Sequence, residues 1–346
     1  CAAILGMSYF GEIKKGTLTL AWATAARNNY VSCHGGLKIF RKEGASYVAS
    51  FFGLSGSGKS TLTHAKHDDK YDIEVLHDDA FVISVEDGSS VALEPSYFDK
   101  TNDYPAGHRE QDYFVTVQNC GVTLDENGRK VLVTEDIRNG NGRTVKSRYS
   151  TPNRVDKISE PIQSIFWIMK DDALPPLVKI TDPRLASILG CTLMTKRSTA
   201  ENTGAGANLD ALVIEPYANP FRVYPLVEDY DKFKALFDKG VDCYIINTGD
   251  FLGKKVTKEV SLGVIETVVD GKANFDLFGG LPGMEYLPVE GYEVPEMNGE
   301  YAALIRDRMQ FRLDYLKAFN DANPEHQIPT DALESIKTIE RFIDVL

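Results

Sequence analysis

The sequence predicts a mixed α/β fold built around a phosphate-binding loop, and three observations carry that prediction. Residues 53–61 read G-L-S-G-S-G-K-S-T, which fits the G-x-x-x-x-G-K-[ST] pattern of phosphate-binding loops. A β-prone apolar run at 46–52 precedes the motif, and the residues from Thr61 onward can open a helix after it. Between residues 112 and 170, several short strand-like runs are separated by turns, which indicates more hairpins than a plain parallel nucleotide-binding sheet contains.

In chain order, apolar runs predict strands that alternate with helices and turns. Residues 1–40 are mixed in pattern and end in a strand and turn at 30–40. Runs bounded by turn residues predict further strands at 71–76, 115–117, 122–124, 131–133, 164–169, 212–214 and 243–246. Two long patterns at 300–319 and 330–345 predict helices, the second with Thr330 or Asp331 as its cap.

Composition narrows the class of protein. The chain has 346 residues, of which 43% are hydrophobic and 25% charged, as in an ordinary globular enzyme. Its net charge of −12 argues against nonspecific binding to nucleic acid or to an anionic membrane surface. No apolar run is long enough to span a membrane, and no signal peptide is visible. Five scattered cysteines without a C-x-x-C motif predict reduced thiols and a cytoplasmic location.

The phosphate-binding motif carries a specific chemistry. Its glycines let backbone N–H groups turn toward phosphate oxygens at a helix N-terminus, where anions are favoured. Lys59 adds a point charge, and the hydroxyl of Ser60 is a ligand for Mg²⁺. The predicted nucleotide-binding residues of the motif are Gly53, Ser55, Gly56, Ser57, Gly58, Lys59, Ser60 and Thr61. The alternative is a glycine-rich turn that binds nothing.

An acidic pair, Asp78 and Asp79, follows a predicted strand about twenty residues after this loop. Phosphoryl-transfer sites need a carboxylate near the Mg²⁺ that the loop hydroxyl holds. We therefore predict a metal-facing pair, with an ordinary turn at the end of a strand as the alternative.

Other residues are uninformative when taken alone. Lys14 and Lys15 fit an exposed turn, His34 fits a histidine with satisfied hydrogen bonds, and Arg148 fits a surface cation. Asn247 fits a turn or a helix cap.

Together, these residues resemble the ATP-dependent phosphoenolpyruvate carboxykinases. The resemblance covers nearly the whole chain and is most specific at F-G-L-S-G-S-G-K-S-T-L, residues 52–62. The matching positions, in order, are Tyr9, Lys14, Lys15, Gly16, His34, the loop, Asp78, Asp79, Glu94, Lys100, Thr101, Arg148, 174–176 and 244–249. The resemblance implies a mixed-sheet nucleotide-binding domain of that family at 46–346. It implies that residues 1–45 are the remnant of the substrate-domain side, which contributes metal and substrate residues.

The resemblance also implies roles for individual residues. Lys59 and the loop amides would hold the β- and γ-phosphates of ATP, and Ser60 would bind the Mg²⁺ of ATP. Lys15, His34 and Asp79 would bind Mn²⁺, which requires a deprotonated lysine. The other implied positions are substrate contacts at Tyr9 and Arg148, nucleotide contacts at Lys100, Lys255 and Ser261, and catalytic roles for Lys15, Lys59, Asp78 and Arg148.

The implied reaction has two steps. Oxaloacetate loses CO₂ to leave pyruvate enolate, whose charge Mn²⁺ stabilises. The enolate oxygen then attacks the γ-phosphate of ATP and gives phosphoenolpyruvate and ADP.

The chain departs from the family pattern at several positions. Gly35 and Gly36 replace a Cys-Ser pair, residues 80–83 replace E-H-G-W, and the segments at 198–202 and 219–224 differ. In the family, an N-terminal substrate domain lies before the position of Tyr9, where this sequence has eight residues. We therefore expect a fragment, a catalytic portion that works with a separately encoded N-terminal half, or a shortened relative. The alternatives are a phosphotransferase resembling the HPr serine kinases and a nonenzymatic ATP-binding regulatory module.

Overall fold

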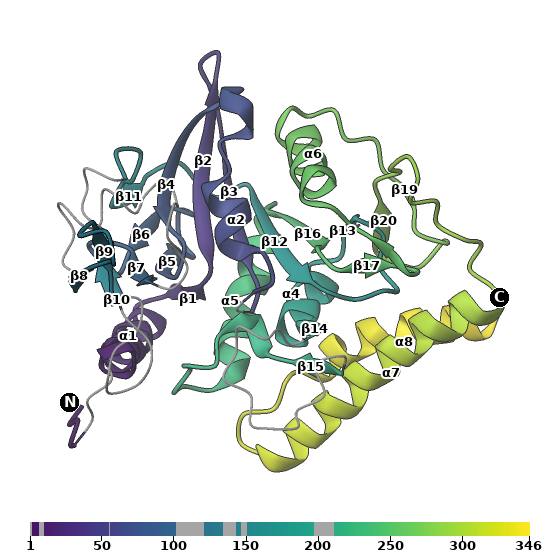
Figure 1. Cartoon of the computed structure of the whole chain (residues 1–346). Coiled ribbons are helices and arrows are strands. Elements are labelled where there is room, and N and C mark those ends of the chain that lie inside the picture. Colours follow the sequence, from purple (N-terminus) through teal and green to yellow (C-terminus); the bar gives the residue numbers. More distant parts are fainter. Residues whose placement is uncertain are drawn as a thin grey trace.

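The computed structural model describes residues 2–6, 10–54, 56–101, 121–133, 143–146, 151–196 and 211–346. Its centre is a sheet of eight strands, in the order β19-β20-β13-β16-β12-β3-β2-β4 (Figure 1). Their bounds are Asp276–Leu277, Met284–Tyr286, Leu177–Ile180, Asp242–Asn247, Ser164–Met169, Ala45–Phe52, Gly36–Lys42 and Asp72–His77. The three strands β16, β12 and β3 are parallel, and antiparallel pairs flank them on both sides. The predicted mixed sheet is therefore confirmed.

Alternation of side chains along β12 divides the core into two layers. Ile165, Trp167 and Met169 face one cluster of buried residues, whereas Phe166 and Ile168 face the other. The first layer is completed by α4 (Pro183–Cys191), α5 (Leu226–Asp238), α7 (Gly299–Ala322) and α8 (Thr330–Asp344). The second is completed by α2 (Lys59–His64) and α6 (Lys258–Val269). The central strand is buried on both faces, as its unbroken apolar run predicts.

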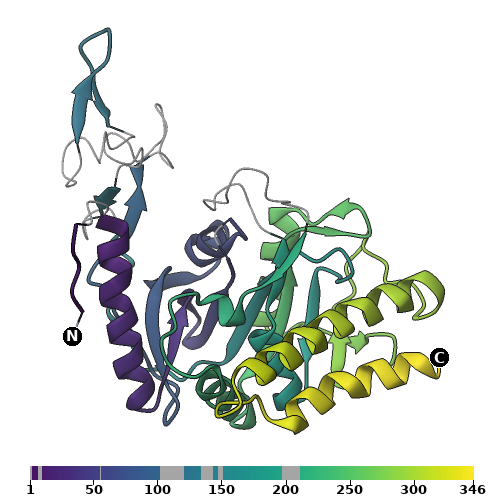
Figure 2. The same ribbon diagram turned by 90° about the horizontal axis from the view of Figure 1, so that it is seen from below.

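A second sheet, β1-β5-β6-β11, stands beside the first. Its strands are Tyr30–His34, Ala80–Ser84, Ser90–Ala92 and Lys157–Ile158. Helix α1 (Phe10–Arg27) covers it by packing Leu18 and Trp22 against Ala80 and Val82 (Figure 2).

The sequence did not reveal α1, and the exposed turn considered at Lys14 and Lys15 is wrong, because both lie within this helix. The buried stripe of α1 is narrow, with Leu18, Trp22 and Ala26 spaced four residues apart. A stripe of one residue per turn gives only a weak helical periodicity.

The long C-terminal helices were predicted correctly as α7 and α8, which pack against each other (Figure 2). The predicted cap of α8 was wrong. Pro329 occupies the N-cap position with an extended backbone, so Thr330 is already the first helical residue.

The remaining elements are short. Four are two-stranded pairs: β7 (Phe98–Lys100) with β10 (Arg143–Val145), β8 (Val122–Leu124) with β9 (Lys130–Leu132), β14 (Met194–Lys196) with β15 (Leu212–Ile214), and β17 (Asp250–Phe251) with β18 (Lys254–Lys255). Two are 3₁₀ turns, η1 (His67–Asp69) and η3 (Pro216–Ala218). The strand predicted at 115–117 lies outside the described residues. The boundary predicted after residue 45 falls inside the β2–β3 hairpin, so residues on both sides of it share one sheet.

Two further expectations concern the whole chain. Among the described residues, Cys33, Cys191 and Cys243 are free and buried; the reduced state of the thiols stays a prediction. Within the described ranges, no helix combines the length and apolar character needed to cross a bilayer.

Gly36 is required for the contact between β2 and α2. A Cβ atom added there would lie 1.8 Å from Oγ1 of Thr63 on α2. We expect Gly36→Ala to lower the free energy of unfolding by about 2 kcal/mol or more, because overpacking displaces α2. Urea unfolding measures this, with Gly263→Ala as the matched control, since its added Cβ meets no atom within 4 Å. Equal stability of Gly36→Ala and the unmodified chain would contradict the prediction.

Candidate active site

The phosphate-binding motif lies at the carboxyl ends of the three parallel strands. The loop follows β3, and residues that follow the next two strands of the sheet, β12 and β16, hold it by hydrogen bonds. Lys170 after β12 donates from Nζ to the carbonyl oxygen of Gly56 at 2.8 Å. Thr248 after β16 donates from Oγ1 to the carbonyl oxygen of Ser57 at 2.7 Å. This edge is the common ligand-binding edge of open α/β sheets.

The loop turns directly into α2. Gly58 adopts a φ of 101°, which favours glycine, and α2 begins at Lys59. Ser57 is buried, whereas Gly56, Ser60 and Thr61 are exposed, as groups that meet a ligand must be. Gly53 directly follows β3, and a Cβ atom added there would lie 2.3 Å from Oγ of Ser57 and 2.9 Å from Cβ of Ile168. Ser55 lies outside the described residues.

Lys59 shares its electrostatic environment with the acidic pair. Burial lowers the pKa of Lys59, and the ammonium groups of Lys15 and Lys14 lower it further. The carboxylates of Asp79 and Asp78 oppose this shift. The phosphate loop and the acidic pair therefore belong to one site.

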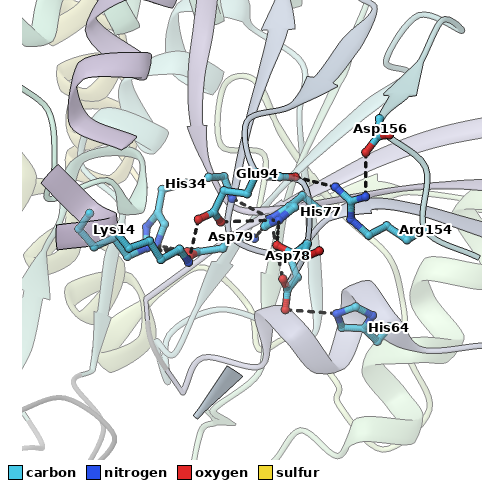
Figure 3. A network of polar contacts seen from close by, with 12 residues as sticks. Lys14, His34, His64, His77, Asp78, Asp79, Glu94, Arg154 and Asp156 are labelled. Atoms are coloured by element: carbon cyan, nitrogen blue, oxygen red, sulfur yellow. Dashed lines mark hydrogen bonds and ion pairs between the residues drawn. The ribbon is translucent and has the colours of Figure 1, made fainter. Parts of the chain in front are cut away.

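Strand pairing brings His34 to the acidic pair. Asp78 and Asp79 are the two residues that join β4 of the large sheet to β5 of the small sheet. In the small sheet, His34 at the end of β1 is paired with Ala80, and the N–H of Gly35 donates to the carbonyl oxygen of Asp79 at 3.1 Å. Helix α1 then carries Lys14 over the same edge (Figure 3). The next residue, Lys15, contacts the same carboxylate.

Asp79 is the hub of this cluster. Lys15 donates from Nζ to its two carboxylate oxygens at 2.9 and 2.8 Å, and Lys14 donates to Oδ2 at 2.7 Å. Nε2 of His34 lies 3.0 Å from Oδ1. Burial alone would raise the pKa of Asp79, but the contact with His34 and the ammonium groups of Lys15 and Lys14 hold it well below its usual range. The structure thus gathers the three residues predicted to bind Mn²⁺.

The imidazole of His34 faces oxygen acceptors with both ring nitrogens. Nδ1 contacts the carbonyl oxygen of Ala218, and Nε2 faces the carboxylate of Asp79. Burial and the charge of Lys59 lower the pKa of His34 to about 4, so at neutral pH the ring is neutral and has one N–H. If Nδ1–H donates to Ala218, the lone pair of Nε2 points at a carboxylate. A cation between Nε2 and Asp79 would satisfy both groups.

Asp78 points the other way, toward the phosphate-loop helix. Nε2 of His64 on α2 lies 3.2 Å from its Oδ2 (Figure 3). Burial would raise the pKa of Asp78, but the contact with His64 and the nearby His77 hold it well below its usual range. The two neighbouring carboxylates therefore serve different sides of the site.

Glu94 is one of the positions that match the family, and the resemblance assigned it no role. In the structure, its Oε1 lies 3.1 Å from Nζ of Lys14. Burial raises the pKa of Glu94 to about 6, against the opposing charge of Lys14. Arg154 donates to the carbonyl oxygen of Glu94 at 2.6 Å. Glu94 therefore supplies a second carboxylate for Lys14, whereas Lys15 donates to both carboxylate oxygens of Asp79.

His77 is a site residue that sequence reasoning missed. Its side chain is fully buried, and its Nδ1 accepts hydrogen bonds from the N–H groups of Asp79 and Ala80, both at 3.0 Å. Nε2 faces the carbonyl oxygen of Ser96 at 3.2 Å, so the neutral Nε2–H tautomer satisfies every contact. This ring fixes the backbone from which the two carboxylates diverge. No local signal marks it, because a histidine that ends a strand has no fixed role.

We expect His77→Leu to lower the affinity for the divalent cation about 10- to 100-fold, as loss of a residue that orients metal ligands does. His77→Asn retains an acceptor near the position of Nδ1 and is expected to recover part of the loss. Mn²⁺ titration of activity and of binding, beside urea unfolding, measures both variants. Equal cation affinity in the leucine variant and the unmodified chain would show that the ring serves packing alone.

The other predicted residues are less tightly gathered. Lys255 on β18 is exposed, with Nζ 3.5 Å from the carbonyl oxygen of Thr248. Ser261 on α6 is buried and donates to the carbonyl oxygen of Thr257 at 3.1 Å. Lys100 ends β7. Tyr9 and Arg148 lie outside the described residues.

The segment 219–224, which departs from the family pattern, borders the cluster through one aromatic ring. Nζ of Lys15 lies 4.9 Å from the centre of the Phe221 ring, and His34 meets the same ring edge-on at 5.5 Å. Within the described residues, no group of three or more His, Cys, Asp or Glu side chains could hold a metal. The candidate set at Asp79 differs from such a group because one of its three members is a lysine.

Comparison with known proteins found a matching family and matches to individual relatives. The sequence model of the family described as phosphoenolpyruvate carboxykinase matches residues 1–296. A phosphoenolpyruvate carboxykinase (ATP) from Aeropyrum pernix is 25% identical over 345 residues. The matched region covers 89% of this chain and 66% of that relative, so the chain spans just under two thirds of the relative's length.

Proposed function

The chain belongs to the ATP-dependent phosphoenolpyruvate carboxykinase family, and from this premise we propose that it converts oxaloacetate and ATP to phosphoenolpyruvate, CO₂ and ADP. The observation that carries the proposal is the approach of Lys15, His34 and Asp79 to one another beside the phosphate loop. A kinase that acts on protein side chains needs the loop and an acidic residue. It does not need a second, nitrogen-rich cation site for an enolate.

The donor set at Asp79 fits Mn²⁺. It offers a carboxylate, an imidazole whose Nε2 lies 3.0 Å from that carboxylate, and the Nζ of Lys15 within 3 Å of the same oxygens, which would bind a cation once it has lost a proton. Imidazole and carboxylate are both suitable ligands for such a cation. Lys15, His34 and Asp79 would hold it. A cation bound there acts as a Lewis acid that stabilises negative charge on the enolate oxygen.

Other residues of the chain would bind the phosphates of ATP and its Mg²⁺. Lys59 and the N–H groups of residues 53–61 would bind the β- and γ-phosphates, since both lie at the N-terminus of α2. Ser60 would hold the Mg²⁺ of ATP, with Asp78 on the neighbouring turn. Lys14 forms ion pairs with Asp79 and Glu94. It would therefore stay protonated, keep a positive charge near the transferred phosphoryl group, and not compete with Lys15 as a ligand of the cation.

Tyr9 and Arg148 would contact the substrate, and Arg148 would offset charge on the phosphoryl group. Lys100, Lys255 and Ser261 would lie along the nucleotide. These five roles rest on the family match alone.

Phosphoenolpyruvate formation from oxaloacetate, ATP, Mg²⁺ and Mn²⁺ tests the proposal, with Lys59→Ala and Arg148→Ala as controls. Product that disappears in both variants is the expected result. If ATP binds and no product forms, a separately encoded N-terminal half is added to the assay. Activity that returns supports a two-chain enzyme. Continued inactivity would overturn the proposal in favour of another phosphoryl acceptor or a regulatory ATP-binding module.

A further inference from the structure

Lys38 is a fully buried lysine in the middle of β2, outside the residues that gather at the active site. Its Nζ donates to the carbonyl oxygens of Leu62 at 2.7 Å and Ala65 at 3.1 Å, and it lies 3.0 Å from Nε2 of His67. The ring of Phe40 lies 4.6 Å from the same nitrogen. All three hydrogen-bonding directions of the ammonium are therefore occupied.

Two of these contacts hold the end of the phosphate-loop helix. Helix α2 has only six residues, so most of its carbonyl groups have no partner within the helix. Leu62 lies in its last turn, and Ala65 is its C-cap. Lys38 binds both carbonyl oxygens and places a positive charge at the negative end of the helix.

Gly36 and Lys38 are two residues apart on β2, so both face α2. The glycine lets Thr63 of α2 approach the strand, and the lysine binds the end of the same helix. Strand β2 thus fixes the distance of α2 from the sheet and also the position of its C-terminal end. The opposite end of this short helix carries Lys59 and Ser60.

The third contact extends the network to α6. Nδ1 of His67 lies 2.9 Å from Oε1 of Glu266, and Lys70 donates to Oε2 of the same carboxylate at 3.1 Å. With Lys38 charged, Nε2 of His67 accepts from the ammonium and Nδ1–H donates to Glu266. One tautomer thus satisfies the whole chain of contacts. Because α6 carries Ser261, the network joins two elements with predicted nucleotide-binding residues.

We propose that Lys38 is a positioning residue for nucleotide binding, which holds α2 against β2 and, through His67 and Glu266, against α6. This inference rests on the proposed function of the phosphate loop. Lys38 touches neither nucleotide nor substrate. It fixes the positions of Lys59 and Ser60, the first residues of α2, for the binding of the phosphates.

Lys38→Met tests the proposal, because methionine has a similar length and cannot donate. We expect the dissociation constant for Mg·ATP, measured by titration calorimetry on the full chain, to rise about tenfold. The KM for oxaloacetate should stay within about twofold. Lys42→Met on the same strand is the matched control, since its side chain is 41% exposed, and it should leave both constants unchanged.

Glu266→Gln provides a second, milder variant on a partly exposed side chain. It should weaken Mg·ATP binding about threefold, and the double variant Lys38→Met/Glu266→Gln should bind no more weakly than Lys38→Met alone, because one network is lost only once. If Lys38→Met does not fold, Glu266→Gln decides the question.

The outcomes separate this inference from the proposed reaction. Weaker nucleotide binding with an unchanged KM for oxaloacetate supports it, and so does weaker binding in a chain that makes no phosphoenolpyruvate. Lower stability with unchanged Mg·ATP affinity overturns it and leaves Lys38 a purely structural residue. An unmodified chain that binds no Mg·ATP overturns both proposals.

A pH dependence offers an independent readout. Burial lowers the pKa of Lys38 from its ordinary value of 10.5 to about 7, against the opposing charge of Glu266. Between these values the unfolded chain binds more protons than the folded one, so stability from this group rises with pH. The groups that face it are His67 from η1 and Glu266 from α6. We expect the unmodified chain to gain stability relative to Lys38→Met between pH 7 and 10.

Discussion

Replacing Asp79 with asparagine is expected to reduce kcat for phosphoenolpyruvate formation at least about a hundredfold and to weaken Mn²⁺ binding by a similar factor. The carboxylate is the common partner of Lys14, Lys15 and His34. An amide of the same size removes the negative charge that all three share. Mn²⁺ binding followed by electron paramagnetic resonance, beside steady-state kinetics, measures the two effects separately.

The matched control is Asp87→Asn, an exposed carboxylate beyond the far end of β5. It should change neither quantity. If Asp79→Asn bound Mn²⁺ as tightly as the unmodified chain, the cluster would be an ion-pair network that stabilises α1 and not a cation site. Nucleotide affinity should fall much less than Mn²⁺ affinity, because Asp79 contacts Lys14, Lys15 and His34, whereas Asp78 is the carboxylate that contacts the phosphate-loop helix.

Lys59→Met should have the other large effect, a loss of about a thousandfold in kcat/KM for ATP. The ammonium of Lys59 is held in a site that already contains Lys14 and Lys15, and burial lowers its pKa. Because burial and the neighbouring lysines disfavour the charged form of Lys59, phosphate oxygens that bind beside it stabilise its ammonium group strongly. Single-turnover kinetics with varied ATP measure the loss.

Lys66→Met, an exposed lysine just beyond α2, is the control for Lys59→Met. It should keep the kinetics of the unmodified chain, and the KM for oxaloacetate should stay within about threefold in both variants. Turnover by Lys59→Met at the rate of the unmodified chain would assign residues 53–61 to a structural turn, the alternative that the sequence left open.

The parts of this molecule that could be predicted from the sequence are those that depend on patterns of neighbouring residues. The phosphate loop is a contiguous motif, and β12 is an uninterrupted apolar run that only a strand buried on both faces explains. The convergence of Lys15, His34 and Asp79 is not local. It depends on the pairing of β1 with β5 and on α1 lying across them, and the narrow buried stripe of α1 gave no helical signal.

Lys38 shows a different limit of sequence reasoning. Between Leu37 and Ile39, a lysine has the position of a solvent-facing residue on a half-buried strand. In the structure it is buried, because two carbonyl groups at the end of a short helix need a donor there. The need arises from another element of the fold. A pattern read along β2 alone therefore cannot contain it.

The two carboxylates of the turn between β4 and β5 belong to adjacent residues, and this has a mechanical consequence. Asp78 is tied to α2 through His64, whereas Asp79 is tied to α1 and to the small sheet. Consecutive Cα atoms are about 3.8 Å apart whatever the conformation of a trans peptide. The spacing between the two proposed cation positions is therefore limited by covalent geometry. Any displacement of the small sheet against the large one would therefore leave the two proposed cation positions close together, because Asp78 and Asp79 share one peptide unit.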